Sequence, residues 1–256
     1  MSKRLVILGA GESGIGAAIL GKQNEYDVFV SDMGVIAKKY KDVLKHNEIE
    51  WEDEGHTESK IINADLVVKS PGIPDRIPLI QKLNEASVAV ISEIEFAALF
   101  TDANIIGITG SNGKTTTTMM VHHILSHAGF DVALGGNIGD SFAKQVLNNK
   151  ENYVLELSSF QLDGIDKFKP HIAIITNITP DHLDRYDYKF ENYIASKFRI
   201  AMNQTSDDYL IYDSDDEVIV SYIRTHKIQS TLVPFSLTRK VTNGTYLEQN
   251  NIIIEF

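Results

Sequence analysis

The sequence predicts an α/β protein with two doubly wound, mostly parallel sheets. Short β-branched runs alternate with longer helical patterns, which is typical of parallel strands joined by helices. A strand, a glycine loop and a helix also follow one another twice, at Gly9 and at Gly110, and each such unit is the natural beginning of its own sheet. We expect a small Rossmann-like domain over residues 1–93 and a larger P-loop-type domain over 94–256, with the change near Ser92–Thr101.

Hydrophobic periodicity and turn residues predict the elements in order. The expected strands are Arg4–Leu8, Asp27–Ser31, Leu66–Lys69, Val88–Ile91, Asn104–Thr109, Val132–Leu134, Tyr153–Leu157, Ile172–Thr176, Tyr209–Tyr212 and Thr231–Pro234. The expected helices are Ser13–Lys22, Ile77–Glu85, Glu93–Leu99, Lys114–Ala128, Ser141–Leu147 and Phe190–Asn203. Near the end, Asn243-Gly244 is a two-residue hairpin signal, which predicts paired strands at Arg239–Thr242 and Thr245–Glu248.

Composition excludes several classes of protein. The chain has 256 residues, of which 43% are hydrophobic and 23% charged, so it is globular and long enough to bury a core. No apolar run approaches the ~18–20 residues that span a bilayer, and the opening run Leu5–Leu8 enters a glycine turn, so it is a strand and not a signal peptide. The net charge of −11 argues against a nucleic-acid-binding face. Without cysteine there are no disulfides or thiolate metal sites, which is compatible with the cytoplasm, where we expect a monomer.

The first glycine loop has the pattern of a nucleotide-binding turn. The run from Gly9 to Gly14 matches G-x-G-x-x-G between a strand and a helix, where glycines let the backbone approach a phosphate at the helix N-terminus. Asp32 ends the next strand, where a carboxylate can accept hydrogen bonds from a ribose or a base. The pattern does not choose between NAD and a nucleotide sugar, and a plain strand–helix turn is the alternative.

The second glycine loop is the strongest signal in the sequence. A buried strand runs into Gly110-Ser111-Asn112-Gly113-Lys114-Thr115-Thr116 and then into a helix. Loop N–H groups there would cradle the phosphates of ATP, Lys114 would reach the β- and γ-phosphates, and the Thr115 hydroxyl would bind Mg²⁺. The strict Walker pattern is not met, because position 108 is Ile, but the shorter G-x-x-G-K-T form is present.

A phosphate-bound metal also needs a carboxylate from a neighbouring strand. Glu156 interrupts the apolar run Tyr153–Leu157, which is costly unless the charge is paired or coordinated. His182 and its acidic neighbours follow the strand Ile172–Thr176, at an edge where loops of an α/β sheet converge. Taken singly, His182 reads as a surface histidine and Lys197 as an exposed helix lysine.

Several motifs together resemble the Mur ligase family. Those that carry the resemblance are Gly110–Thr116, Gly135-Gly136-Asn137-Ile138-Gly139, Leu155-Glu156-Leu157-Ser158-Ser159-Phe160-Gln161-Leu162 and Asp181-His182-Leu183-Asp184-Arg185-Tyr186. The last two resemble the versions in the D-glutamate-adding branch, as do Ser70-Pro71-Gly72-Ile73 and Ser92-Glu93-Ile94-Glu95-Phe96. The resemblance covers the chain up to about Asn203.

The resemblance implies roles for particular residues. It implies that Lys114, Glu156, His182 and Lys197 are catalytic, that Gly110–Thr116 bind ATP, and that two Mg²⁺ sites use Thr115, Glu156, His182 and a carbamylated Lys197. It implies that substrate is bound by Glu12, Ser13, Asp32, Ser70, Pro71, Gly72, Asn137, Ser158, Gln161 and His182. Met33-Gly34 stands where some members have Thr-Arg, which changes the expected uridine contacts.

The activity implied by the resemblance is ATP-dependent addition of D-glutamate to UDP-N-acetylmuramoyl-L-alanine through an acyl phosphate, without a nucleic-acid or membrane partner. The family also has a C-terminal domain and a histidine-asparagine motif, and neither precedes Phe256. We therefore expect a piece of a longer enzyme that binds but does not complete ligation. The alternatives are a Mur ligase for another amino acid, a non-catalytic UDP-sugar-binding module, and an NAD-dependent dehydrogenase that uses the first loop.

Overall fold

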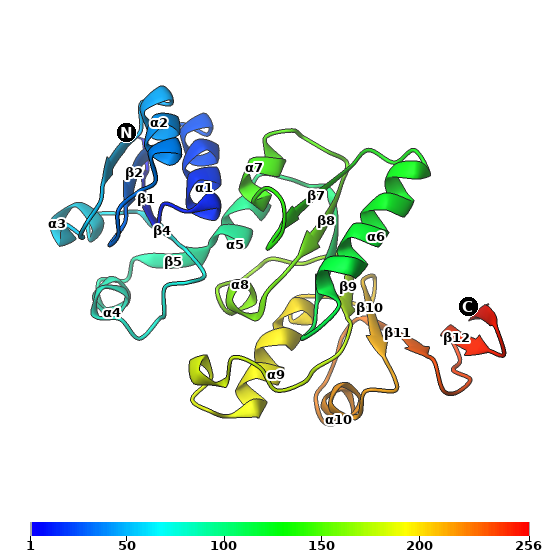
Figure 1. The fold of residues 1–256 in the computed structure, drawn as a ribbon. Coiled ribbons are helices and arrows are strands. Elements are labelled where there is room, and N and C mark those ends of the chain that lie inside the picture. The colour runs from blue at the N-terminus through cyan, green and yellow to red at the C-terminus, as the bar shows by residue number, and fades with distance from the viewer. Residues whose placement is uncertain (1, 256) are drawn as a thin grey trace. The chain divides into compact units, whose positions relative to one another are not determined.

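The computed structural model describes residues 2–255 and divides into two compact units (Figure 1). The first unit contains residues 1–102, 138–150 and 163–168, and the second contains 103–137, 151–162 and 169–256. No helix among the described residues is long and apolar enough to cross a membrane. The fold is α/β, with a parallel sheet in the first unit and a mostly parallel one in the second, as the sequence predicts.

The first unit is built on a five-stranded parallel sheet of order β3-β2-β1-β4-β5. Its strands are β1 (Arg4–Leu8), β2 (Asp27–Ser31), β3 (Glu50–Glu52), β4 (Leu66–Lys69) and β5 (Ala89–Ser92). Its helices are α1 (Glu12–Gln23), α2 (Lys38–His46), α3 (Glu58–Ile61), α4 (Pro78–Glu85), α5 (Glu93–Ala98) and α7 (Phe142–Val146). The sheet forms because β1 and β4 are continuous apolar runs, which suits strands that are buried on both faces.

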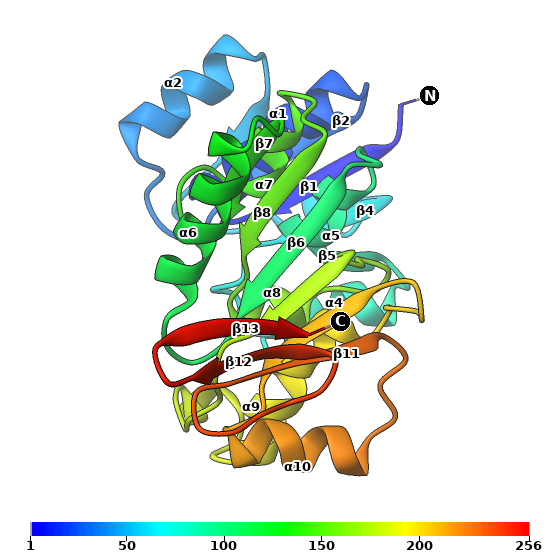
Figure 2. The ribbon, with the colours of Figure 1, turned by 90° about the vertical axis from the view of Figure 1, so that its right-hand side faces the viewer.

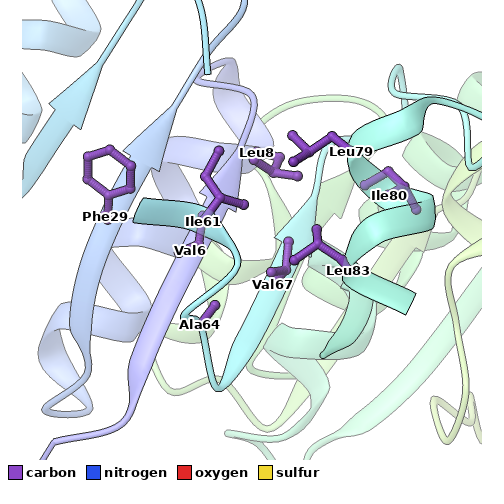
Figure 3. Packing of buried hydrophobic residues seen from close by; sticks show 9 residues of the cluster. All are labelled: Val6, Leu8, Phe29, Ile61, Ala64, Val67, Leu79, Ile80 and Leu83. Atoms are coloured by element: carbon purple, nitrogen blue, oxygen red, sulfur yellow. The ribbon is translucent and has the colours of Figure 1, made fainter. Parts of the chain in front are cut away.

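A hydrophobic cluster covers one face of this sheet (Figure 3). Side chains from β1, β2 and β4 meet others from α3 and α4, and every member is at most 8% exposed. The members are Val6, Leu8, Phe29, Ile61, Ala64, Val67, Leu79, Ile80 and Leu83. Burial of this apolar surface, at roughly 25 cal/mol per Å², holds the strands whose ends form the first site.

Helix α5 carries two buried carboxylates that bind backbone amides of distant segments. Glu95 accepts hydrogen bonds from the N–H groups of Asp166, Lys167 and Phe168 at 2.8–2.9 Å. Glu93 accepts one from the N–H of Ala143 in α7. Burial and the nearby Glu12 raise the pKa of Glu93, and the hydrogen bond lowers it, to a net value of about 7. Through these contacts α5 ties residues 138–150 and 163–168 into the first unit.

The second unit is built on an eight-stranded sheet of order β13-β12-β11-β10-β9-β6-β8-β7. Its strands are β6 (Asn104–Thr109), β7 (Val132–Gly136), β8 (Asn152–Glu156), β9 (Ile172–Ile175), β10 (Tyr209–Asp213), β11 (Thr231–Ser236), β12 (Gly244–Glu248) and β13 (Asn251–Glu255). Its helices are α6 (Lys114–His127), α8 (Ser159–Asp163), α9 (Phe190–Phe198) and α10 (Glu217–Thr225), with 3₁₀ turns at Leu183–Arg185 and Arg199–Ala201. Central β6 lies between β8 and β9, so the loops after these three strands meet at one edge (Figure 2).

The hairpin predicted at Asn243-Gly244 is wrong. Arg239–Thr242 is not a strand; β12 pairs in parallel with β11, and the hairpin is formed by β12 and β13. Gly244 is needed for a different reason, because a Cβ there would overlap the carbonyl oxygen of Pro234 in β11. Close approach to a neighbouring strand, not a turn, therefore explains this glycine.

Six short elements are absent from the predicted strands and helices: β3, α2, α3, α8, α10 and β13. Each is short or polar, and α2 buries Leu44 alone among its nine residues. Helix α9 also ends earlier than expected, since a 3₁₀ turn replaces its last part from Arg199. Helices this short have little periodicity of their own and are held by packing.

Candidate functional site

The first unit has a cavity of about 760 Å³ at the carboxyl ends of its strands. Its polar side includes the loop glycines Gly9 and Gly11, Asp32 after β2, and Ser70 and Gly72 after β4. Its other side is apolar, and it is lined by Met33, Ile73, Pro74, Ile77, Pro78 and Leu79. Gly55 and His56 after β3 complete the lining, so the loops after four strands converge where ligands bind in open α/β sheets.

Local hydrogen bonds fix the shape of the first glycine loop. Asp32 accepts one from the N–H of Ala10 at 2.6 Å and another from the N–H of Gly34 at 2.8 Å. Gly9 has φ +94°, and a Cβ at Gly14 would overlap the carbonyl oxygen of Gly9. The loop therefore needs both glycines, and Asp32 joins it to the end of β2.

Some predicted residues do not line this cavity. Glu12, at the first turn of α1, contacts the Tyr40 hydroxyl at 3.2 Å and Lys144 at 3.5 Å. Ser13 and Pro71 also lie outside the lining. His56, by contrast, lines the cavity and was not predicted, because it follows the short strand β3, which sequence patterns miss.

The second glycine loop of Gly110–Gly113 is held by the loop after β9. The Asn112 N–H donates to the Asn177 side chain at 2.9 Å, and the Asn112 carbonyl oxygen accepts from the hydroxyl of Thr176 at 2.7 Å. The Ser111 hydroxyl donates to the carbonyl oxygen of Thr179 at 2.9 Å. Gly113 has φ +80° and caps α6, so the loop turns directly into the helix.

Two lysines approach the same point of this loop. Lys114 donates to the carbonyl oxygens of Gly110 and Ser111, both at 2.9 Å, and Lys197 of α9 donates to Gly110 at 2.8 Å. Lys197 is 1% exposed, which contradicts its interpretation as an ordinary exposed helix lysine. A buried ammonium group, that of Lys197, and a partly buried one, that of Lys114, meet at one carbonyl, which favours an anion as the ligand of this loop.

Glu156 lies at the end of β8 beside the start of α6. Its carboxylate is 1% exposed and accepts from the Thr115 hydroxyl at 2.7 Å and from the Asn137 side-chain amide at 2.7 Å. The Thr115–Glu156 pair brings a hydroxyl and a carboxylate together at the phosphate loop. Both are hard oxygen donors of the kind that Mg²⁺ prefers.

A cavity of about 160 Å³ lies beside these groups. It is lined by Lys114, Asn137, Ser158, Ser159, Phe160, Asp181, His182, Tyr193 and Lys197. Five of these were predicted as site residues, whereas Ser159, Phe160, Asp181 and Tyr193 were not. Gln161 does not line it, because its side-chain oxygen accepts from the Ser158 N–H and hydroxyl, both at 3.0 Å.

His182 lies at the rim of this second cavity. Its backbone is left-handed, with φ +50°, and its ring lies 5.2 Å from that of Phe160. Its side chain is 55% exposed and has Asp181 3.5 Å away. Among residues 2–255, no three His, Cys, Asp or Glu side chains lie close enough together to hold a metal ion. A metal at Thr115 and Glu156 therefore needs further oxygen ligands, such as phosphate.

Replacing Gly110 by Ala is expected to distort the loop and to weaken nucleotide binding at least about tenfold, because its φ is +146° and a Cβ would overlap the Thr176 hydroxyl. Gly129→Ala is the matched control: its φ is also positive, at +87°, but nothing lies within 4 Å of its Cβ. Titration of both variants with MgATP measures the effect. Equal affinities would contradict the role given to Gly110.

Comparisons with known proteins agree with this geometry. The Mur ligase middle domain matches residues 108–253, and the MurD N-terminal domain matches residues 4–76. UDP-N-acetylmuramoylalanine–D-glutamate ligase of Christiangramia forsetii is 63% identical over 99% of the chain and 57% of that relative. The ligase of the same name in Bacteroides fragilis is 53% identical over 98% of the chain and 57% of its own length. The chain thus spans just over half of the relatives that it matches.

Solved structures show the same fold at low identity. A UDP-N-acetylmuramate:L-alanyl-gamma-D-glutamyl-meso-diaminopimelate ligase from Neisseria meningitides has a TM-score of 0.67 at 16% identity and covers 96% of this chain and 83% of that one. A UDP-N-acetylmuramate-alanine ligase from Thermotoga maritima has a TM-score of 0.57 at 22% identity and covers 92% of this chain and 53% of that one. Since the middle-domain match alone covers more than half of the sequence, the chain belongs to the Mur ligase family.

Proposed function

We propose that the whole protein adds D-glutamate to UDP-N-acetylmuramoyl-L-alanine with consumption of ATP, and that this chain carries its UDP-substrate and ATP sites. The observation that carries the proposal is the Thr115–Glu156 contact at 2.7 Å, beside Lys114 in the second glycine loop. The names of the relatives at 63% and 53% identity support the choice of substrate. We further propose that residues 1–93 and 94–256 are the two functional domains, and that the protein works as a cytoplasmic monomer.

The reaction couples two displacements. An oxygen of the L-alanyl carboxylate attacks the γ-phosphorus of ATP and ADP leaves, which gives an acyl phosphate. The amine of D-glutamate then attacks the carbonyl carbon; phosphate leaves, and the amine loses a proton. Phosphorylation is needed because a carboxylate oxygen is otherwise too poor a leaving group.

The protein must bring two anions together. Lys114 and the loop N–H groups of 110–113 would stabilise the phosphates, and Thr115 and Glu156 would hold Mg²⁺, which screens charge on the transferred phosphoryl group. Asn137, Ser158 and His182 line the adjoining cavity and would orient the muramoyl carboxylate. Gly9, Asp32 and Ser70 line the first cavity and would bind the uridine diphosphate.

We also propose that Lys197 carries a carbamate that serves a second Mg²⁺ together with His182. The crowding of Lys114 and Lys197 at the Gly110 carbonyl oxygen supports this, because conversion of one ammonium to an anion removes the repulsion. Intact-protein mass measured at neutral pH in bicarbonate should show the added mass of one CO₂. If the added mass is lost in Lys197→Arg but kept in Lys169→Arg, the carbamate is assigned to Lys197.

Two assays test the proposed function. Calorimetry on this chain should show binding of UDP-N-acetylmuramoyl-L-alanine, and binding of MgATP; NAD should give no heat. The whole protein should then form product with D-glutamate and not with L-alanine or L-lysine. Product with another amino acid would make it a different Mur ligase, and binding without ATP hydrolysis in the whole protein would make it a UDP-sugar-binding module.

A further inference from the structure

A buried hydroxyl joins a carboxylate to a histidine beside the first cavity. Ser31 ends β2 and is 0% exposed. Its hydroxyl oxygen lies 2.7 Å from Oε1 of Glu52 and 2.7 Å from Nδ1 of His56. Glu52 ends β3, the neighbour of β2, and His56 lies in the loop that follows. The three groups therefore form one hydrogen-bonded chain that ends at a residue of the cavity wall.

The protons in the hydrogen-bonded series Glu52–Ser31–His56 can be assigned. Burial raises the pKa of Glu52, but hydrogen bonds from Thr57 and Ser31 outweigh it, so the net pKa is lowered and Glu52 is an anion that can only accept. The single hydroxyl proton of Ser31 must therefore go to Glu52. The Ser31 oxygen then accepts from His56, whose Nδ1 must carry a hydrogen. A neutral His56 is consequently the Nδ1–H tautomer, with a bare lone pair on Nε2.

The remaining edge of the imidazole is available to a ligand. His56 lines the cavity together with Asp32 and the apolar residues Met33, Ile73 and Pro74. No hydrogen bond to His56 Nε2 occurs among residues 2–255. A flat base between apolar walls would thus meet an acceptor at this ring, and not a donor.

We propose that His56 selects a uracil base by accepting a hydrogen bond from its N3–H; this inference rests on the UDP-substrate site of the proposed function. In a uracil nucleotide N3–H is the sole hydrogen-bond donor of the base, flanked by two carbonyl acceptors. Cytosine has nearly the same shape, but its N3 is an acceptor, so two lone pairs would face each other. The hydrogen bonds through Ser31 keep the hydrogen on Nδ1 of the imidazole, so Nε2 cannot donate to N3 of cytosine.

Binding of UDP and CDP to this chain tests the proposal. The wild type should bind UDP at least about tenfold more tightly than CDP, because the mismatch leaves two acceptors unpaired. In Ser31→Ala the His56 imidazole can adopt either tautomer. This variant should therefore bind CDP more tightly than the wild type does, and the ratio of UDP affinity to CDP affinity should fall. His56→Gln should narrow it as well, since an amide offers either a donor or an acceptor. His46→Gln, an exposed histidine of α2, is the matched control and should leave the ratio unchanged.

The outcomes show whether Ser31 and His56 select the base or only support the structure of the loop. If Ser31→Ala and His56→Gln weaken UDP and CDP alike, the pair is structural and the proposal is wrong, while the UDP-binding function stands. If the wild type binds neither nucleotide, the UDP-substrate site and this inference both fail. Nitrogen-15 NMR of the imidazole gives a second readout: it should find Nδ1 protonated in neutral wild-type His56 and mixed tautomers in Ser31→Ala. A protonated Nε2 in the neutral wild type would overturn the proposal.

Discussion

Turnover of the whole protein should fall by about 10²–10³-fold when Lys114 is replaced by Ala, with the fold retained. The ammonium of Lys114 is the group in the glycine loop that would meet the charge developing between the β- and γ-phosphates. In the structure it donates to the carbonyl oxygens of Gly110 and Ser111 at 2.9 Å, so it is held against the loop that we propose binds the phosphates. Coupled measurement of ADP release with UDP-N-acetylmuramoyl-L-alanine and D-glutamate checks the result.

The control for this substitution is Lys227→Ala, which removes an exposed lysine after α10 of the same unit. It should leave turnover and melting temperature unchanged. If Lys114→Ala keeps near-normal turnover, the second glycine loop does not act on ATP, and the ligase assignment fails with it.

Glu156→Gln should reduce turnover to a similar extent and abolish the Mg²⁺ dependence of nucleotide binding. The substitution keeps the shape of a side chain that is 1% exposed but removes the negative charge. Thr115 can still donate to the new amide oxygen, whereas the amide nitrogen would face the Asn137 amide, another donor. Titration of MgATP, and of ATP with EDTA, into wild type and variant measures the metal-dependent part of the affinity.

Glu191→Gln in the first turn of α9 is the corresponding control, because Glu191 is exposed. It should bind MgATP as the wild type does. A variant Glu156→Gln that melts lower but keeps full Mg²⁺-dependent affinity would show that Glu156 only holds Thr115 and Asn137 in place.

The sequence predicts most of the fold because its central strands are buried on both faces. The observed bounds of β1, β2, β4 and β6 are those predicted, since each is a continuous apolar run between polar or glycine residues. The short strand Glu50–Glu52 has no such run, and its partly exposed residues pair at the sheet edge. Helix α10 escapes because its Val and Ile residues resemble a strand, although Asp216 caps it by accepting from two N–H groups at 2.9 and 3.1 Å.

The site could be predicted as far as parallel topology determines it. Lys114, Thr115 and Glu156 meet because β6 and β8 are neighbours whose loops leave the same edge of the sheet. Strand order does not determine which way a side chain points. Gln161 forms a hydrogen bond with Ser158, and Glu12 forms one with Tyr40, so neither lines the cavity predicted for it. The hydrogen bonds that join Glu52, Ser31 and His56 could not be predicted from the sequence, because these residues meet only when β2 and β3 pair.

The carboxylates of α5 have a consequence for how the protein can be dissected. A gene fragment that stops at residue 102 would contain Glu93 and Glu95 but none of the amides that they bind, which come from Ala143 and from Asp166, Lys167 and Phe168. Without these segments the two side chains would lose both their amide donors and the packing that these segments provide, so α5 would present carboxylates to water where the folded unit has a covered face. A dissected first unit should therefore include residues 138–150 and 163–168 as well as 1–102.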